Sequence, residues 1–305
     1  MAAAASIDAR LLGPLEVEAH AARLALGPTG QRALLARLLL DANRTVAVDR
    51  LLDDLWGEHV PRTAVKMIHI HISKLRKLLP AGTLVTRPPG YAVTIPPEAL
   101  DLVRFERLRE RARNALAGGC AAEAADRLRE ALALWRGPAL AEFDGPFAAI
   151  ESGRVEELRL ACVEDRIDAD LALGGHTPLV GELDALVAHQ PLRERLRGQL
   201  MLALYRSGRQ AQALAAYRQL RQMLSSELGI EPSPALRELE RRMLQQDPTL
   251  DVATVEPRPR PGAAAARPMR ASSLNAQRGA AASNAFWTAA RPSRRGQCAP
   301  TLRGR

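Results

Sequence analysis

The sequence changes its pattern at Pro96–Pro97, and this change limits the possible folds more than any other feature. After it, as far as residue 246, Ala, Leu, Arg and Glu recur with helical periodicity, and short breaks separate about seven helices. Before it, short runs typical of strands alternate with helical segments. A chain of 305 residues is long enough for two cores. We therefore expect a mostly α protein, with an α+β domain over residues 1–97 and an all-α domain over 98–248.

The first 97 residues contain signals for strands, three helices and a hairpin. Short strands are expected over residues 10–18 and 21–27, and helices over 31–40, 49–56 and 61–79. Asp49 is the expected N-cap of the second helix and Gly57 its stop, while Pro61 opens the third helix and Pro80 ends it. Two β-rich runs within residues 83–95 are joined by Pro-Pro-Gly, which indicates a hairpin. This order of elements predicts a winged helix-turn-helix.

The helical part contains three similar breaks, each ending one helix at a glycine and starting the next within a few residues. Gly175 and Gly208 are 33 residues apart, near the period of tetratricopeptide repeats. Gly119 and Gly175 are 56 apart, because residues 135–147 (WRGPALAEFDGPF) are inserted between them. We therefore expect an irregular tetratricopeptide-like stack.

Most of the net charge of +9 lies at the end of the chain. Residues 249–305 carry ten Arg against two acidic residues, a net +8, and no periodic apolar residues. Such a segment buries too little apolar surface to offset chain entropy, so we expect a disordered tail. Charges interrupt every apolar run, and the Ala-rich start lacks the basic region of a signal peptide, which predicts a cytoplasmic protein without membrane contact.

The remaining basic charge is concentrated locally. Residues 61–91 contain six basic side chains, including all three lysines of the chain, and no acidic one. On a helical wheel the apolar residues of the third helix form one stripe, which should face the core: Val65, Ile68, Ile72, Leu75 and Leu79. The opposite side and its flanks carry cations, donors and one apolar side chain: Arg62, Thr63, Lys66, His69, Ile70, Ser73, Lys74, Arg76 and Lys77.

A basic helix face that follows a short helix and a turn is suited to the major groove of DNA. There Lys and Arg meet guanine acceptors or phosphates, and Ile70 can meet a thymine methyl group. Arg87 precedes the hairpin tip, where a cation can reach the minor groove, and the Tyr91 hydroxyl can reach phosphate. The alternatives are a solvated basic face, a loop arginine in water and a packed strand tyrosine.

Several motifs together resemble a known family. LLGPLEV, GQRALLARLLLDANRTVAVDRLLDDLWG, HIHISKLRKLL and LVTRPPGYAV resemble the winged helix of OmpR-type response regulators. With LREALALWRGPAL and the long run PLRERLRGQLMLALYRSGRQAQALAAYRQLRQMLSSELGIEPSPALRELERRMLQQDP, they resemble the Streptomyces antibiotic regulatory proteins (SARP regulators). These pair that DNA-binding domain with a bacterial transcriptional activation domain, and the resemblance covers about residues 7–248.

The resemblance implies a nucleoid-associated transcriptional activator of a secondary-metabolite (antibiotic) gene cluster. It implies binding to direct repeats of double-stranded DNA as a dimer, and contact with RNA polymerase. By motif, His69, Ile70 and Lys74 match base-facing positions, and Arg87 matches the wing arginine of the minor groove. Phosphate-facing positions are matched by Trp56, Arg76 and Tyr91. The turn between the second and third helices carries Glu58 and His59 instead of cations, which suits a polymerase contact better than phosphate.

Other functions remain alternatives at this point. An enzyme is disfavoured, because the sequence lacks a P-loop, a dinucleotide-binding glycine motif, a nucleophile elbow and a zincin helix. His69 and His71 point to different sides of one helix, and the three cysteines are widely spaced, so we expect neither a metal nor a cofactor. Residues 98–248 carry 21 basic and 24 acidic side chains, a balance suited to protein partners. A repressor of the same fold and a tetratricopeptide-like interaction scaffold therefore stay open.

Overall fold

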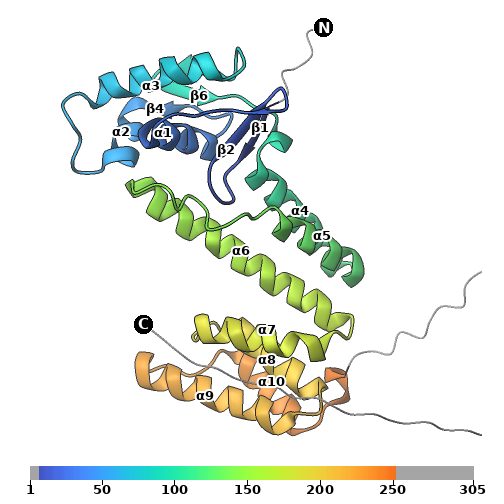
Figure 1. Cartoon of the computed structure of the whole chain (residues 1–305). Coiled ribbons are helices and arrows are strands. Elements are labelled where there is room, and N and C mark those ends of the chain that lie inside the picture. Colours follow the sequence, from blue (N-terminus) through green and yellow to red (C-terminus); the bar gives the residue numbers. More distant parts are fainter. Residues whose placement is uncertain (1–6, 252–305) are drawn as a thin grey trace, which may run out of the picture. The chain divides into compact units, whose positions relative to one another are not determined.

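The computed structural model describes residues 7–251 (Figure 1). The segment predicted to be a disordered tail, 249–305, therefore lies outside the described residues except for its first three. Within the described part, no helix combines the length and the apolar character that crossing a bilayer requires.

The N-terminal elements form a winged helix, as predicted. A first antiparallel sheet contains β1 (Ile7–Arg10), β2 (Glu16–Ala19) and β3 (Ala22–Arg23) in that order. Three helices follow, α1 (Thr29–Leu40), α2 (Val48–Trp56) and α3 (Ala64–Leu78). A second antiparallel sheet, ordered β4-β6-β5, contains β4 (Val46–Ala47), β5 (Leu84–Arg87) and β6 (Gly90–Val93). The turn Pro88–Pro89, which has a cis peptide bond, joins the two strands of the predicted hairpin.

Two helix starts differ from the expectation. α2 begins at Val48, with Ala47 as its N-cap, because the chain enters the helix directly from β4. Asp49 lies in the first turn instead, where its charge favours the positive end of the helix dipole. α3 begins at Ala64, not at Pro61, because the Ala64 amide donates to the Pro61 carbonyl and closes a turn before the helix.

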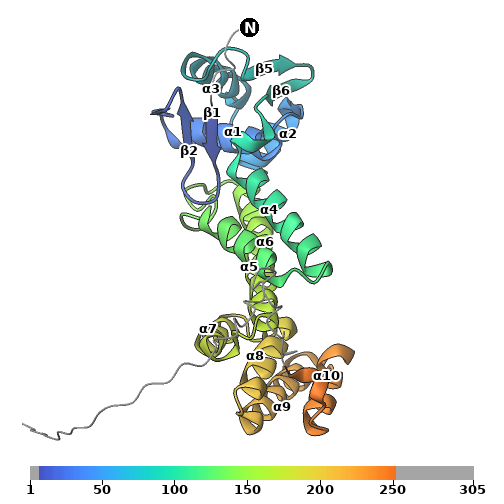
Figure 2. The same ribbon diagram turned by 90° about the vertical axis from the view of Figure 1, so that its right-hand side faces the viewer.

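The rest of the described chain is helical and contains the seven α-helices that the periodicity predicts. They are α4 (Asp101–Ala117), α5 (Ala121–Ala133), α6 (Pro146–Ala172), α7 (His176–His189), α8 (Glu194–Arg206), α9 (Gln210–Leu228) and α10 (Pro234–Leu244). Short 3₁₀ helices precede and follow them at Pro97–Ala99 and Pro248–Leu250. Neighbouring helices from α4 to α6 and from α7 to α9 pack in sequence order, as in a tetratricopeptide-like stack (Figure 2).

Residues 7–251 form two hydrophobic cores, and neither of them is confined to the winged helix. The first core runs without a break from Leu34 and Ile68 of the winged helix to Phe105, Leu128 and Phe147 of α4–α6. The second contains the apolar side chains of α7–α10. The 27-residue helix α6 contributes to both, its beginning to the first core and its last turns to the second.

The insertion that interrupts the repeat period joins the winged helix to the helical part. The backbone amide of Arg136 donates to the Leu12 carbonyl at 2.8 Å, and the Leu15 amide donates to Glu142 Oε1 at 2.5 Å. Asp101, at the start of α4, is almost fully buried and accepts hydrogen bonds from the amides of Leu11 and Leu12. Burial raises the Asp101 pKa, although these amide hydrogen bonds oppose the shift.

Candidate nucleic-acid interface

Helix α3 presents one face to the core and the other to solvent. Ala64, Ile68, Ile72 and Leu75 are buried, and the helix packs against α1. All the residues predicted on the outer face and its flanks are exposed, namely Arg62, Thr63, Lys66, His69, Ile70, Ser73, Lys74, Arg76 and Lys77. Arg62 and Thr63 lie in the turn that precedes the helix rather than in its first turn.

Val65 was predicted to face the core, and this prediction is wrong. Its side chain is 43% exposed, and Ala64 takes the buried position instead. Val65 lies at the edge of the apolar stripe and in the first turn of the helix, where the core side of α3 is already filled by Ala64.

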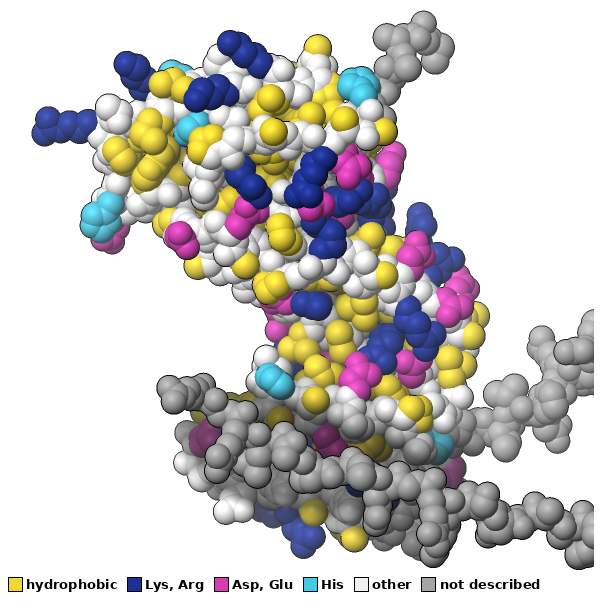
Figure 3. Space-filling model, in the orientation of Figure 1, with side chains coloured by type: hydrophobic (Ala, Val, Ile, Leu, Met, Phe, Trp, Pro, Cys, Tyr) yellow, Lys and Arg dark blue, Asp and Glu magenta, His cyan; other side chains and the backbone are white. Residues whose placement is uncertain are grey.

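The cations of this region have no acidic partners. Among the described residues, neither an ion pair nor a side-chain hydrogen bond involves Arg62, Lys66, Lys74, Lys77 or Arg87, whereas many arginines of the helical part are ion-paired. In Figure 3, Lys and Arg side chains gather over α3 at the top of the view, among histidine and hydrophobic side chains and without an acidic one. The surface therefore has an uncompensated positive charge.

Arg76 ties α3 to the hairpin instead of standing free. Its Nε donates to the Leu84 carbonyl at 3.0 Å and its Nη2 to Thr86 Oγ1 at 2.6 Å. Its guanidinium also lies 5.9 Å from the ring centre of Tyr91, which is only 8% exposed. The Tyr91 ring also meets His69 edge to face, with 6.5 Å between the ring centres. Tyr91 is thus mainly a packed strand residue between two side chains of α3.

The β5–β6 hairpin holds Arg87 at its tip. Arg87 is exposed and pairs with Gly90 across the Pro88–Pro89 turn. Gly90 also pairs with Ala47 of β4, where the strands approach so closely that a Cβ on Gly90 would lie 1.8 Å from the Val46 carbonyl oxygen. The position of the wing therefore depends on a residue without a side chain.

The turn between α2 and α3 is more apolar than the sequence suggested. Trp56 is half-buried at the end of α2 and packs on the first core. Glu58 and His59 are exposed, as is Val60 at 41%. Val65, in the first turn of α3, adds a second exposed valine, and we name this set of exposed residues the α2–α3 knob (Glu58, His59, Val60 and Val65). Sequence reasoning missed its two valines, because a valine near a helix is usually buried.

His71 does not belong to the exposed face. It is partly buried against Gly30 at the start of α1, and its Nδ1 is buried without a hydrogen-bond partner among the described residues. Burial lowers the pKa of His71, and nearby Lys74 lowers it further.

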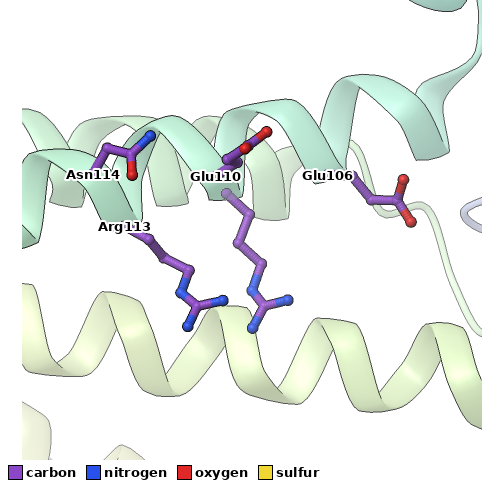
Figure 4. Close-up of a pocket in the computed structure, with 5 residues that line it drawn as sticks. Glu106, Glu110, Arg113 and Asn114 are labelled. Atoms are coloured by element: carbon purple, nitrogen blue, oxygen red, sulfur yellow. The ribbon is translucent and has the colours of Figure 1, made fainter.

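Charged side chains line a pocket on α4, and two of its arginines form ion pairs with α6. Figure 4 shows Glu106, Glu110, Arg113 and Asn114 on α4, with Arg113 pointing towards the neighbouring helix. Asp165 of α6 lies 3.4 Å from Arg109 and 4.0 Å from Arg113. The charges therefore hold α4 against α6. In the described part of the chain no group of three or more His, Cys, Asp or Glu residues could hold a metal ion.

Comparison with known proteins agrees with this geometry. Residues 23–93 match the family described as "Transcriptional regulatory protein, C terminal", and residues 100–244 match "Bacterial transcriptional activator domain". Regulatory protein DnrI of Streptomyces peucetius is 37% identical over 79% of this chain and 93% of its own length. The solved structure of Mycobacterium tuberculosis EmbR, in complex with a low affinity phosphopeptide, is 37% identical with a TM-score of 0.76, over 80% of this chain and 66% of that one.

Longer regulators also match. Regulatory protein AfsR of Streptomyces coelicolor is 48% identical over 79% of this chain, and the match covers 24% of AfsR. The chain thus spans about a quarter of the AfsR proteins that it matches. The two family matches and the relative matched over nearly its whole length show that the chain belongs to the SARP family of transcriptional regulators.

Proposed function

We propose that the chain binds specific double-stranded DNA by placing the outer face of α3 in the major groove and the β5–β6 hairpin against the adjacent minor groove. The observation that supports this proposal is the exposed, unpaired set of cations on α3 and at the hairpin tip. DNA phosphates are the polyanion that such a surface attracts, and a helix fits the width of the major groove. Arg87 then reaches into the minor groove, where the potential is most negative.

The side chains of α3 divide into two roles under this proposal. His69, Ile70 and Lys74 face base edges, while Arg62, Thr63, Lys66, Ser73 and Lys77 hold phosphates. Arg76 positions the hairpin, and its free Nη1 can still meet phosphate. Trp56 and the Tyr91 hydroxyl are the remaining phosphate candidates. Of these two, the half-buried Trp56 is the more accessible.

Sequence selection from random duplexes tests these roles on the full chain. Lys74→Ala should lower affinity for the selected site by about 1–3 kcal/mol and flatten the preference at one or two base pairs. Lys77→Ala should weaken all duplexes alike and reduce the salt dependence of binding. Arg111→Ala, an exposed and unpaired arginine of α4, is the matched control and should change neither. An unchanged sequence preference in Lys74→Ala would show that α3 is oriented differently.

We further propose that two molecules bind direct repeats head-to-tail, about one helical turn apart. One α3 covers only a few base pairs, too few to specify a site in a genome. Binding to a two-repeat duplex should therefore be cooperative, and inserting half a helical turn between the repeats should abolish the cooperativity. Footprinting around the chromosomal neighbourhood of its own gene would show whether the target is a secondary-metabolite cluster, as the family resemblance implies.

The α2–α3 knob is the proposed contact with RNA polymerase. It lies beside the proposed DNA face, yet it offers an acidic and apolar surface that suits a protein better than phosphate. Changing Glu58 and His59 to Ala should leave the footprint intact and lower activated transcription in vitro. Transcription at the wild-type level would restrict the polymerase contact to the helical part. Transcription that falls below the level measured without any regulator would instead indicate a repressor.

A further inference from the structure

The helical part contains a groove that none of the contacts described so far uses. It has a volume of about 560 Å³ and is formed by α7, α8 and α9. Its walls are about half polar, and their apolar side chains come from all three helices: Val187, Leu200, Leu204, Ala216 and Met223. Four of these side chains, Val187, Leu200, Leu204 and Ala216, also belong to the second hydrophobic core, so the groove lies outside the winged helix.

Arg197 of α8 lines this groove as a buried cation whose Nε has no hydrogen-bond partner among the described residues. It is only 5% exposed, and its guanidinium has neither an ion pair nor a hydrogen bond among the described residues. Burial lowers the pKa of Arg197, which Asp184 opposes. Asp184 itself is exposed and too far away for an ion pair. An unpaired buried cation costs free energy, which a carboxylate bound in the groove would offset.

The other buried charges of the described chain are satisfied. Arg37 donates a hydrogen bond to Asp54, and Asp101 accepts hydrogen bonds from backbone amides. On α6, Glu164 pairs with Arg193, Asp165 with Arg195, and Asp170 with Arg166. Arg197 is thus the exception among the buried charged side chains that the structure describes. Such an exception, directed into an open groove, is typical of a ligand contact.

We propose that this groove binds a segment of a partner protein in which an acidic side chain, flanked by apolar ones, pairs with Arg197. The carboxylate of Asp or Glu matches the planar guanidinium in two hydrogen bonds. Arg209 also lines the groove, and its Nε donates to Gln212, so the two cations outnumber Asp184, which is the acidic residue of the lining. The apolar half of the walls gives a contact surface for the side chains that flank this carboxylate in a peptide.

The C-terminal segment of this chain is a poor candidate for the occupant of this groove. Residues 252–305 carry ten Arg and one acidic residue, Glu256, so their charge opposes that of Arg197 and Arg209. An acidic and apolar peptide from another protein has the matching charge.

The test uses the full chain and two pools of fluorescein-labelled peptides. In the first pool a single Glu is flanked by Leu, Ile or Met at random, and in the second pool Gln replaces the Glu. The Glu pool should bind at least about tenfold more tightly, the factor that corresponds to one charge-assisted hydrogen bond. Arg197→Met should remove this preference, while Arg218→Met, an exposed arginine of α9 outside the groove, should keep it.

Stability provides the second measurement. Because Arg197→Met replaces an unpaired buried cation by an apolar side chain of similar length, its Tm should equal or exceed that of the wild type. Equal binding of the two pools, or an unchanged preference in Arg197→Met, overturns the proposal. A lower Tm in Arg197→Met also overturns it, since Arg197 would then be a structural residue. Binding of benzoate, but not of the peptides, in an Arg197-dependent way would replace the peptide with a small carboxylate.

Discussion

At the scale of single residues, two positions around the interface are constrained by close packing rather than by charge. Gly90 brings β6 against β4, and no side chain fits between its Cα and the Val46 carbonyl. His71 sits between the exposed face of α3 and α1, partly buried and next to Lys74. Neither residue is part of the proposed contact surface, yet each supports the elements that present it.

Gly90→Ala should strongly destabilise the winged helix. A Cβ at 1.8 Å from a backbone oxygen forces β4 and β6 apart, which we expect to cost about 3 kcal/mol or more. Urea denaturation measures the loss. The control is Gly153→Ala in α6, where nothing lies within 4 Å, and which should stabilise the chain by about 0.5–1 kcal/mol. Equal stability of the two variants would mean that the strand pairing at Gly90 is wrong.

His71 should make stability fall in mild acid. Because its pKa in the folded state lies below the ordinary value of 6.5, the unfolded chain takes up a proton that the folded chain excludes. The free energy of unfolding therefore decreases as pH falls through 6.5 towards the folded-state pKa, and this contribution is fully present only above that interval. His71→Leu should show a shallower pH dependence in thermal unfolding. The same slope in both proteins would contradict this assignment.

At the scale of elements, α3 and the hairpin act as one unit because Arg76 connects them. Its two side-chain hydrogen bonds reach β5, and its guanidinium covers Tyr91 of β6. Under the proposed DNA binding, α3 and the hairpin held at a fixed distance can meet two grooves at once, which two independently moving elements do only with a loss of entropy. The coupling of the two elements thus resides in a residue whose charge alone suggested a phosphate contact.

Arg76→Met should therefore differ from Lys77→Met. Loss of the contacts of Arg76 should lower the free energy of unfolding by about 1 kcal/mol, a small value because the side chain is exposed. Lys77→Met, at a neighbouring exposed position without contacts, should leave stability unchanged. Amide hydrogen exchange should show faster opening of β5 and β6 only in Arg76→Met. Protection of the hairpin at the wild-type level would show that Tyr91 packing suffices.

At the scale of the whole molecule, the winged helix depends on the helices that follow it. Its core continues into α4–α6, Asp101 caps the amides after β1, and Glu142 bonds to both Leu15 and Arg32. Residues that match one family therefore complete the core of residues that match another. The long helix α6 contributes side chains to this core and also to the second core.

A fragment of residues 1–97 should accordingly be unstable. It keeps the complete winged helix but loses Asp101 and the apolar side chains of Phe105 and Phe147, which leaves part of the first core open to water. A fragment of residues 1–172, which retains α4–α6, should unfold cooperatively at a clearly higher temperature. Circular dichroism and dye binding to exposed apolar surface compare the two. A cooperative transition of the short fragment at the same Tm would show that the winged helix folds alone.

The sequence by itself determined the local structure of this protein. Helical periodicity, Pro-Pro-Gly at the hairpin and the glycine breaks act between residues close along the chain, so they predicted the winged helix, the seven helices and the exposed face of α3. The same local signals placed the outer-face residues from Arg62 to Lys77 on one surface, since a helix converts spacing directly into direction. The exact strand bounds within residues 7–27, the short strand β4 and the helix starts near Asp49 and Pro61 were missed, because strand pairing and turns decide them.

Only the tertiary structure decided which side chains have partners. The exposure of Val65, the connection of Arg76 to the hairpin and the unpaired state of Arg197 all depend on residues that are remote in sequence or on neighbouring elements. The role of residues 135–147 belongs here too, because an apparent interruption of a repeat became the joint between β1–β2 and α4–α6. Burial and charge compensation arise from contacts across the fold, and no pattern along one segment specifies them.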